Sequence, residues 1–209
     1  MVLLSDKLWF PPVKTASPEG IVAFGGDLSA NRLLLAYKSG IFPWYNEDEP
    51  IVWYSPKQRM VLFPNDLNIS KSMKVLLRKD TFKITFNQNF REVINGCKTM
   101  YRKDQGGTWI TDEMEQAYIH LHRLGYAKSV EVWLDNTLVG GLYGVDLGTV
   151  FCGESMFSKV SNTSKVAFIC LVEKLKKEHY KLIDCQVYNE HLESLGAKEI
   201  PRAEFLNYL

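Results

Sequence analysis

The chain has 209 residues, of which 46% are hydrophobic and 23% are charged, as is typical of a globular protein that buries a substantial core. This composition excludes a disordered, a collagen-like or a small disulfide-stapled protein. The 25 basic and 24 acidic residues give a net charge of +1, so the chain lacks the overall positive charge of a basic nucleic-acid-binding domain. Any contact with a polyanion must therefore come from local patches.

Apolar runs and cysteine spacing indicate the compartment. The longest uninterrupted apolar run, 166–172, is far shorter than the roughly 18 residues that a membrane span needs. Charges at Asp6 and Lys7 interrupt the N-terminal apolar stretch before a signal-peptide core forms. The four cysteines lack the paired C-x-x-C spacing of zinc or dithiol sites: Cys97, Cys152, Cys170 and Cys185. We therefore expect a cytoplasmic protein with reduced thiols, no metal and no membrane association.

Composition divides the chain at about residue 60. The part before this point holds six of the eight prolines, three of the five tryptophans and one clear helical stretch, 31–39, which ends at Gly40. We expect residues 1–60 to form a small, loop-rich N-terminal domain and residues 61–209 to form a second, larger domain.

From Asn68 onward the hydrophobic periodicity is more regular. Ser70 and Thr111 are expected N-caps of helices that run to Lys79 and to about Leu124, and a further helix is expected over 89–101. Strands are expected over 82–86, 128–134, 137–146, 149–154 and 181–186, the middle three as an antiparallel meander, with helices over 163–179 and 189–195. This order predicts an α+β fold. It resembles the mixed sheet of N-acetyltransferases, which splays open to admit an acyl donor.

The meander carries two unusual segments. The first, 140–144, contains three glycines, which favours a surface approached closely by a ligand or another backbone, with a strongly twisted edge as the alternative. The second places Glu154 among apolar neighbours, where a carboxylate needs a cation or a donor. Glu154 is therefore either a site residue or the partner of Lys159 or Lys165.

Residues 182–186 contain two polar side chains at alternate positions of the expected strand. The alternation places Asp184 and Gln186 on one face, which suits a functional site, although a structural hydrogen-bonded pair would look the same. Cys185 is expected on the opposite face, and Cys152 follows the hydrophobic alternation, so neither thiol is an attractive nucleophile.

The histidines do not form a ligand set. His120 and His122 lie two apart on one helix and cannot face one ligand together, and His179 and His191 are isolated. Neither a Cys–His hydrolase nor a metal centre is favoured.

Several tryptophans occur in loop-like contexts. Trp44 and Trp109 are the candidates for stacking on a nucleobase, because a core position is less expected there. Interior packing is the alternative, and for Trp53 it is the preferred interpretation.

Eight ordered segments resemble the leucyl/phenylalanyl-tRNA protein transferase family over about residues 20–209. They are Gly25-Gly26-Asp27-Leu28-Ser29, Tyr37 with Gly40-Ile41-Phe42-Pro43-Trp44, Trp53-Tyr54-Ser55-Pro56, Gly107-Thr108-Trp109-Ile110-Thr111, Glu131-Val132-Trp133, 140–144, 151–158 and 182–186. By this resemblance, the chain is an aminoacyltransferase that moves leucine or phenylalanine, and in some members methionine, from aminoacyl-tRNA. The acceptor is the N-terminal lysine or arginine of a protein, which is thereby marked for the bacterial N-degron pathway. The resemblance implies no cofactor, and we expect a monomer.

The resemblance also assigns roles to residues. Trp44 and Trp109 would flank the 3′-terminal adenosine of the tRNA, and Glu154, Asp184 and Gln186 would form the transfer centre. The apolar side chain of the donor would be surrounded by Tyr37, Leu142, Phe151, Met156, Phe168, Leu171 and Ile183.

The transfer needs little base strength, because the donor ester is already activated and the acceptor α-amine has a pKa of roughly 8. Gln186 would orient the amine through its carbonyl oxygen, Asp184 would fix Gln186 or take up charge, and Glu154 would read the positive charge of the acceptor. Two routes for the proton stay open: Asp184 as a general base, or a shuttle through the tRNA ribose.

The chain departs from the family pattern at three places. Family members usually continue beyond residues 207–209, which bears on any substrate contact made by a C-terminal tail. Leu142 stands where methionine is common, and Leu171 replaces a larger aromatic side chain, with Phe168 able to refill that volume. The preference among donor side chains is expected to shift accordingly.

Basic residues on two expected helices offer an approach path for tRNA, with solvated helix faces as the alternative. They are Lys71, Lys74, Arg78 and Lys79 on one helix, and Lys98, Arg102 and Lys103 near the end of the next.

Two rival functions are considered. A module that binds N-degrons without catalysis would keep Glu154 but would need neither the tryptophan pair nor Asp184 and Gln186. An acetyl-CoA-dependent transferase would carry an R/Q-x-x-G-x-G/A phosphate loop at a helix start, and this string does not precede the expected helix at Thr163.

Overall fold

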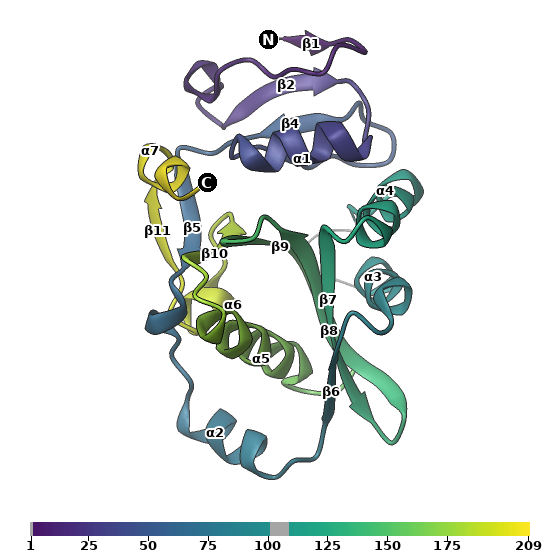
Figure 1. Ribbon diagram of the computed structural model, residues 1–209, viewed down its shortest axis with the longest axis vertical. Helices are drawn as coiled ribbons and strands as arrows, with labels where there is room; N and C mark the ends of the chain where they lie inside the picture. The colour runs from purple at the N-terminus through teal and green to yellow at the C-terminus, as the bar shows by residue number, and fades with distance from the viewer. Residues whose placement is uncertain (1, 101–108) are drawn as a thin grey trace.

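A four-stranded sheet forms the N-terminal part of the computed structural model, which describes residues 2–100 and 109–209 (Figure 1). Its strands lie in the order β1 (Leu3–Leu4), β2 (Ile21–Gly25), β4 (Val52–Tyr54) and β3 (Phe42–Pro43). The sequence did not predict this sheet, although much of this part lies outside its short strands, as expected for a loop-rich segment. Strands of two to five residues, interrupted by proline and glycine, are too short for a visible alternation of polar and apolar residues.

Helix α1 (Ala30–Lys38) lies between β2 and β3 and confirms the helix expected there. Its N-cap is Ser29, whose side chain accepts a hydrogen bond from the Arg32 backbone, and Gly40 follows the helix with a φ of +71°. A short 3-10 helix, η1 (Val13–Thr15), precedes β2. The α1 helix contacts β3 and α4, so the N-terminal sheet is joined to the rest of the molecule on this side.

The second sheet has seven strands in the order β11, β5, β10, β9, β8, β7, β6. Their bounds are β5 (Gln58–Leu62), β6 (Lys83–Phe86), β7 (Ala127–Leu134), β8 (Thr137–Asp146), β9 (Val150–Ser158), β10 (Leu182–Gln186) and β11 (Lys198–Pro201). Strands β7, β8 and β9 form the expected antiparallel meander, and β9 pairs with β10 in parallel. The mixed sheet confirms the α+β fold class.

Two strands of this sheet, β5 and β11, were not expected from the sequence. Strand β5 directly follows the N-terminal part of the chain and lies between β10 and β11, antiparallel to both. The division into domains at about residue 60 stays a prediction. The sequence-distant pairing of β5 places residues 58–62 next to β10, as the second strand from one edge of the large sheet.

Helices cover both faces of the seven-stranded sheet (Figure 1). α3 (Phe90–Thr99) and α4 (Asp112–Arg123) contact one face, and α5 (Thr163–Lys177) crosses the other. The remaining elements are α2 (Lys71–Arg78), α6 (Glu190–Glu193), α7 (Arg202–Phe205) and the 3-10 helices η2 (Pro64–Asp66) and η3 (Leu206–Tyr208). The Ser70 side chain accepts a hydrogen bond from the backbone N–H of Met73, and the Thr111 side chain accepts one from that of Met114. These bonds confirm both N-caps.

Because both faces are covered, successive residues of the central strands belong to different cores. Met60, Leu62 and Ile183 pack in the core that contains α5, whereas Val61 and Leu182 pack in the core that contains α3, α4 and the N-terminal sheet.

The glycines of β8 are packed against this chain's own groups. A Cβ atom on Gly140 would lie 2.3 Å from Thr163 Oγ1, and one on Gly144 would lie 2.3 Å from the Cys152 carbonyl oxygen and 2.6 Å from the Phe151 ring. Other groups therefore approach the β8 glycines closely, as expected, and these groups belong to the protein itself.

Within the ranges that the structure describes, no helix is long and apolar enough to cross a membrane.

Candidate active site

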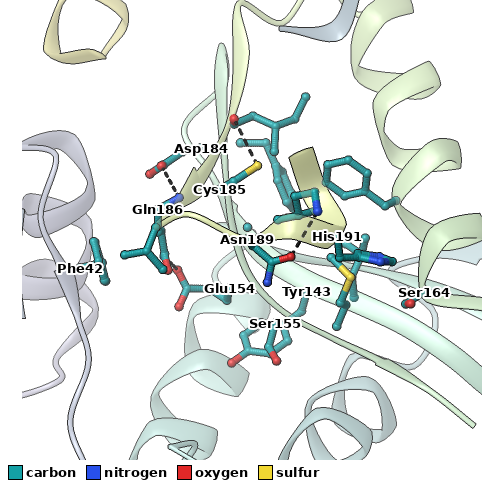
Figure 2. A pocket seen from close by; sticks show the side chains of 18 of the residues that line it. Phe42, Tyr143, Glu154, Ser155, Ser164, Asp184, Cys185, Gln186, Asn189 and His191 are labelled. Carbon is teal, nitrogen blue, oxygen red and sulfur yellow. Dashed lines mark hydrogen bonds between the residues drawn. The ribbon is translucent and has the colours of Figure 1, made fainter. Parts of the chain in front are cut away.

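The large sheet opens where β9 and β10 part. Their parallel pairing runs from Leu182 opposite Val150 to Asp184 opposite Cys152, which is the last pair between the two strands in the described sheet. A cavity of about 430 Å³ lies beyond this pair (Figure 2). Its wall includes most of the residues singled out in the sequence: Trp44, Trp109, Leu142, Phe151, Glu154, Met156, Phe168, Leu171, Ile183, Asp184 and Gln186.

A β-bulge presents Glu154 to the cavity. Tyr143 of β8 pairs with Ser155 and the next residue, Gly144, pairs with Gly153, so Glu154 is the extra residue on β9. An extra residue bends its strand and re-aims the side chain, which explains how a carboxylate reaches the cavity from a strand with buried neighbours.

A second bulge lies in β10. Asp184 pairs with Val61 of β5 while Gln186 pairs with the adjacent Met60, so Cys185 is the extra residue, and Gln186 has a φ of +66°. The expected regular alternation of 182–186 was therefore wrong. Regular alternation would place Cys185 on the face opposite Asp184 and Gln186, but Cys185 also lines the cavity.

Asp184 is fully buried and both of its oxygens are engaged. Arg59 donates from Nε to Oδ1 at 2.7 Å and from Nη2 to Oδ2 at 2.6 Å. The backbone N–H of Gln186 also donates to Oδ1, at 2.9 Å. A buried carboxylate held by a planar guanidinium and a backbone donor is fixed in position, and it in turn fixes the turn at Gln186.

Arg59 is itself enclosed. Its guanidinium carbon lies 4.6 Å from the centre of the Phe42 ring and 4.7 Å from that of the Phe205 ring. These rings come from β3 and α7, so the support of Asp184 depends on both ends of the chain.

Glu154 accepts two hydrogen bonds from neighbouring side chains. Gln186 Nε2 donates to Oε1 at 2.7 Å, and the Tyr118 hydroxyl donates to Oε2 at 2.9 Å. The Tyr118 hydroxyl also bonds to the Tyr37 hydroxyl. Burial raises the pKa of Glu154 to about 7, against the lowering effect of these donors.

The alternative ion pairs for Glu154 are not formed in the part of the chain that the structure describes. The carboxylate bonds to Gln186 and Tyr118 instead, and the Lys159 ammonium lies 5.8 Å from the centre of the Phe157 ring. Glu154 is therefore a half-buried carboxyl group held by two side-chain donors, with a pKa that burial raises to about 7.

The thiols at the site are not activated. Burial is the first cause that raises the pKa of both Cys152 and Cys185, and the neighbouring Asp184 carboxylate raises it further. Both remain protonated at neutral pH, which agrees with the expectation that neither is a nucleophile.

Trp44 and Trp109 both line the cavity, and Trp44 is 41% exposed. Trp53, expected in the interior, is fully buried, and its indole N–H donates to the Gly25 carbonyl at 2.8 Å. The structure thus separates two tryptophans at the cavity from one in the core.

Six of the seven residues proposed for the donor side chain line the cavity. Tyr37 lies outside the wall that the described residues form, buried behind Tyr118 and Glu154. Its hydroxyl bonds to the Tyr118 hydroxyl and also interacts with the Glu154 carboxylate.

The sequence did not point to several residues at the site. Arg59 and Tyr118 support the two carboxylates, and Phe42, Asn189 and His191 line the cavity (Figure 2). Burial and the charge of Lys165 lower the pKa of His191, so its imidazole is neutral at pH 7. Of these residues, only Asn189 could have been proposed from the sequence, because it is a polar residue three positions after Gln186.

The basic runs are divided by the structure. Lys71, Lys74, Arg78 and Lys79 are all exposed on or next to α2, whereas Lys98 is paired with Asp112 and Glu115. Arg102 and Lys103 lie outside the described residues. Only the α2 run is available in the described structure as an uncommitted basic surface.

No group of three or more His, Cys, Asp or Glu side chains is placed to hold a metal ion within residues 2–100 and 109–209. The absence of a metal requirement stays a prediction.

Comparison with known proteins agrees with the geometry. A family model described as leucyl/phenylalanyl-tRNA protein transferase matches residues 61–209, and one for the N-terminal domain of the same family matches residues 26–57. Similar relatives, named leucyl/phenylalanyl-tRNA–protein transferase, occur in Flavobacterium johnsoniae (63% identity, 100% of this chain and 99% of the relative) and Flavobacterium psychrophilum (59%, 100% and 99%). One in Thermodesulfovibrio yellowstonii is 53% identical over 98% of this chain and 83% of its own length.

Among solved structures, FemX is similar in fold, with a TM-score of 0.55 and 10% sequence identity over 82% of this chain and 66% of that one. A likeness at this identity concerns the fold alone. The sequence matches carry the assignment: the chain belongs to the leucyl/phenylalanyl-tRNA protein transferase family and is an aminoacyltransferase.

Proposed function

We propose that this protein transfers leucine or phenylalanine, and also methionine, from aminoacyl-tRNA to the N-terminal lysine or arginine of acceptor proteins. The product would carry a bulky apolar N-terminal residue and enter the bacterial N-degron pathway. The observation that carries the proposal is the arrangement of Glu154, Gln186 and Asp184 at the wall of an apolar cavity that Trp44 and Trp109 also line.

The cavity fits the donor. Leu142, Phe151, Phe168, Leu171 and Ile183 provide an apolar wall, and Met156 adds an unbranched, adaptable side chain. Such a wall selects by size: it accepts leucine, phenylalanine and methionine, and its discrimination against a side chain one methylene shorter is about 10- to 200-fold.

The tryptophans fit the terminal adenosine of the tRNA. Both lie at the cavity, and the exposed ring of Trp44 is open to stacking with a base. With a net charge of +1, the protein has no global attraction for tRNA, so recognition would be concentrated on the 3′ end with generic phosphate contacts from α2.

The reaction forms a peptide bond between the acceptor's α-amino nitrogen and the donor's carbonyl carbon. The bond between that carbon and the ribose oxygen breaks, the amine loses one proton and the ribose oxygen gains one. Alignment of amine and ester supplies most of the rate, since the ester is already activated.

Gln186 would orient the amine through its side-chain carbonyl oxygen, because its Nε2 group is engaged by Glu154. Asp184 acts as a positioning residue: Arg59 and the Gln186 backbone occupy its oxygens and it is fully buried. Glu154 is the better candidate for the proton, because its pKa of about 7 suits both acceptance and return at neutral pH.

A direct test incubates the protein with leucyl-, phenylalanyl-, methionyl- and valyl-tRNA and a peptide that begins with arginine. We expect transfer of the first three amino acids and little transfer of valine, unaffected by a chelator. A parallel reaction with acetyl-CoA tests the rival acetyltransferase function. Acetylation of the peptide, or no transfer from any charged tRNA, would refute the proposal.

A further inference from the structure

A second cavity, of about 240 Å³, lies behind the first. Its wall combines apolar side chains such as Val130 and Leu175 with polar ones such as Lys128 and Asp146. Phe151 and Leu171 line both cavities. Among the described residues, these two side chains are the wall that the cavities share.

Helix α5 runs past both cavities with a single face. Ser164, Phe168 and Leu171 line the first cavity. Leu171, Lys174 and Leu175 line the second, together with Glu178, which directly follows the helix. Residues spaced by three or four positions lie on the same side of a helix, one above the other. Leu171 is therefore the position at which this face passes from the first cavity to the second.

The two side chains of the shared wall come from different kinds of element. Phe151 belongs to β9, which pairs on both sides, and its ring lies so close to Gly144 that a Cβ there would be 2.6 Å from Phe151 Cε1. Leu171 projects from α5, and the second cavity borders both side chains of the shared wall. Shortening Leu171 would therefore join the two cavities without altering a strand or the ring that packs against Gly144.

We propose that Leu171 sets how deeply a donor side chain enters, and that the second cavity is the space into which the pocket extends when Leu171 is shortened. The inference rests on the proposed function, in that it takes the first cavity to hold the donor side chain. The ligand class that the extended pocket would admit is an aminoacyl-tRNA with a side chain larger than phenylalanine, such as the indole of tryptophan.

The test compares Leu171→Ala with Leu175→Ala. Leu175 lines the second cavity but is not among the residues that line the first. It is also a leucine and is 3% exposed, against 4% for Leu171, so the two changes remove the same atoms from the same core. Transfer of tryptophan and of leucine from charged tRNA to a peptide beginning with arginine is measured for both variants and for the unmodified protein.

We expect the ratio of kcat/KM for tryptophan over leucine to rise by about tenfold or more in Leu171→Ala and to stay unchanged in Leu175→Ala. No rise in Leu171→Ala, or an equal rise in both variants, would overturn the proposal. If either alanine variant fails to fold, Leu171→Val and Leu175→Val make the same comparison with a smaller truncation.

The same variants separate this inference from the proposed function. If the unmodified protein transfers no leucine, the proposed function fails, and the depth of the pocket is then measured by the binding of leucyl- and tryptophanyl-adenosine analogues. A gain of tryptophanyl-adenosine affinity confined to the Leu171 variant would still support the assignment of the wall, and its absence would refute it.

Discussion

The guanidinium of Arg59 donates hydrogen bonds to both carboxylate oxygens of Asp184, at 2.7 and 2.6 Å, although the two residues are 125 positions apart in the sequence. The two side chains are at most 1% exposed. This ion pair joins β5 to β10 directly beneath the Gln186 turn, and the Phe42 and Phe205 rings enclose it from two sides. The position of the proposed transfer centre therefore depends on an ion pair whose two side chains are buried away from water.

Breaking this ion pair should destabilise the protein strongly. Arg59→Ala or Asp184→Ala leaves an uncompensated buried charge, so each should lower the free energy of unfolding by about 3 to 5 kcal/mol in urea titrations. The double variant should cost less than the sum of the two. Lys198→Ala, which breaks the exposed pair with Asp66, is the control and should cost less than about 1 kcal/mol. If the buried and exposed changes cost the same, Arg59 does not hold Asp184.

Asp184 and Gln186 should act as one unit in turnover. Gln186→Ala and Asp184→Ala should each lower kcat far more than donor affinity, because both changes remove alignment of the amine. The double variant should be no slower than the poorer single variant. Gln58→Ala changes an exposed glutamine of β5 and should leave kcat unaffected. Additive losses in the double variant would mean that the two residues have separate roles.

The pH profile should report the ionisation of Glu154. If its carboxylate accepts the amine proton, kcat/KM should rise with pH through an inflection near 7, followed by the inflection of the acceptor amine near 8. Glu154→Gln should remove the lower inflection and leave the upper one. A profile that keeps both inflections in Glu154→Gln would assign the lower one to another group.

The same carboxyl group should make stability depend on pH. The pKa is raised from about 4.5 in the unfolded chain to about 7 in the folded protein, so the folded state binds the proton more tightly. The favourable contribution is complete below about pH 4.5 and is lost as the pH rises through 7. Relative to the difference at pH 4, Glu154→Gln should gain about 3 kcal/mol over the unmodified protein at pH 8, which is the free-energy equivalent of a pKa raised from 4.5 to about 7. An equal difference at both pH values would contradict the raised pKa.

Trp44→Ala should weaken the binding of a short aminoacyl-adenosine analogue by about 1 to 3 kcal/mol, through loss of base stacking. Trp9→Ala is the matched control, since Trp9 is 37% exposed against 41% for Trp44 and is not among the residues that line the cavity. Intact charged tRNA should show a shallow dependence on salt, with a slope of about 0.7 to 0.9 log units for each phosphate contact. Normal binding of both ligands by Trp44→Ala would place recognition elsewhere on the tRNA.

The sequence predicted the meander, the helix caps and many residues of the cavity wall, because these depend on local periodicity or on the family resemblance. It did not predict the bulges at Glu154 and Cys185. A bulge depends on the register between two strands, and a single sequence contains no register. Arg59 was missed for a related reason: β5 is short, and its pairing with β10 and β11 is visible only once distant segments meet.

The placement of β5 also constrains the order in which the molecule is built. Strand β5 leaves the ribosome long before β10 and β11, the two strands that flank it in the sheet. Until β10 has been synthesised, the Arg59 guanidinium lacks its partner Asp184. Non-local pairing of this kind slows folding and exposes strand edges in the meantime. The nascent chain can therefore form the Arg59–Asp184 ion pair beneath the proposed transfer centre only after β10 has been synthesised.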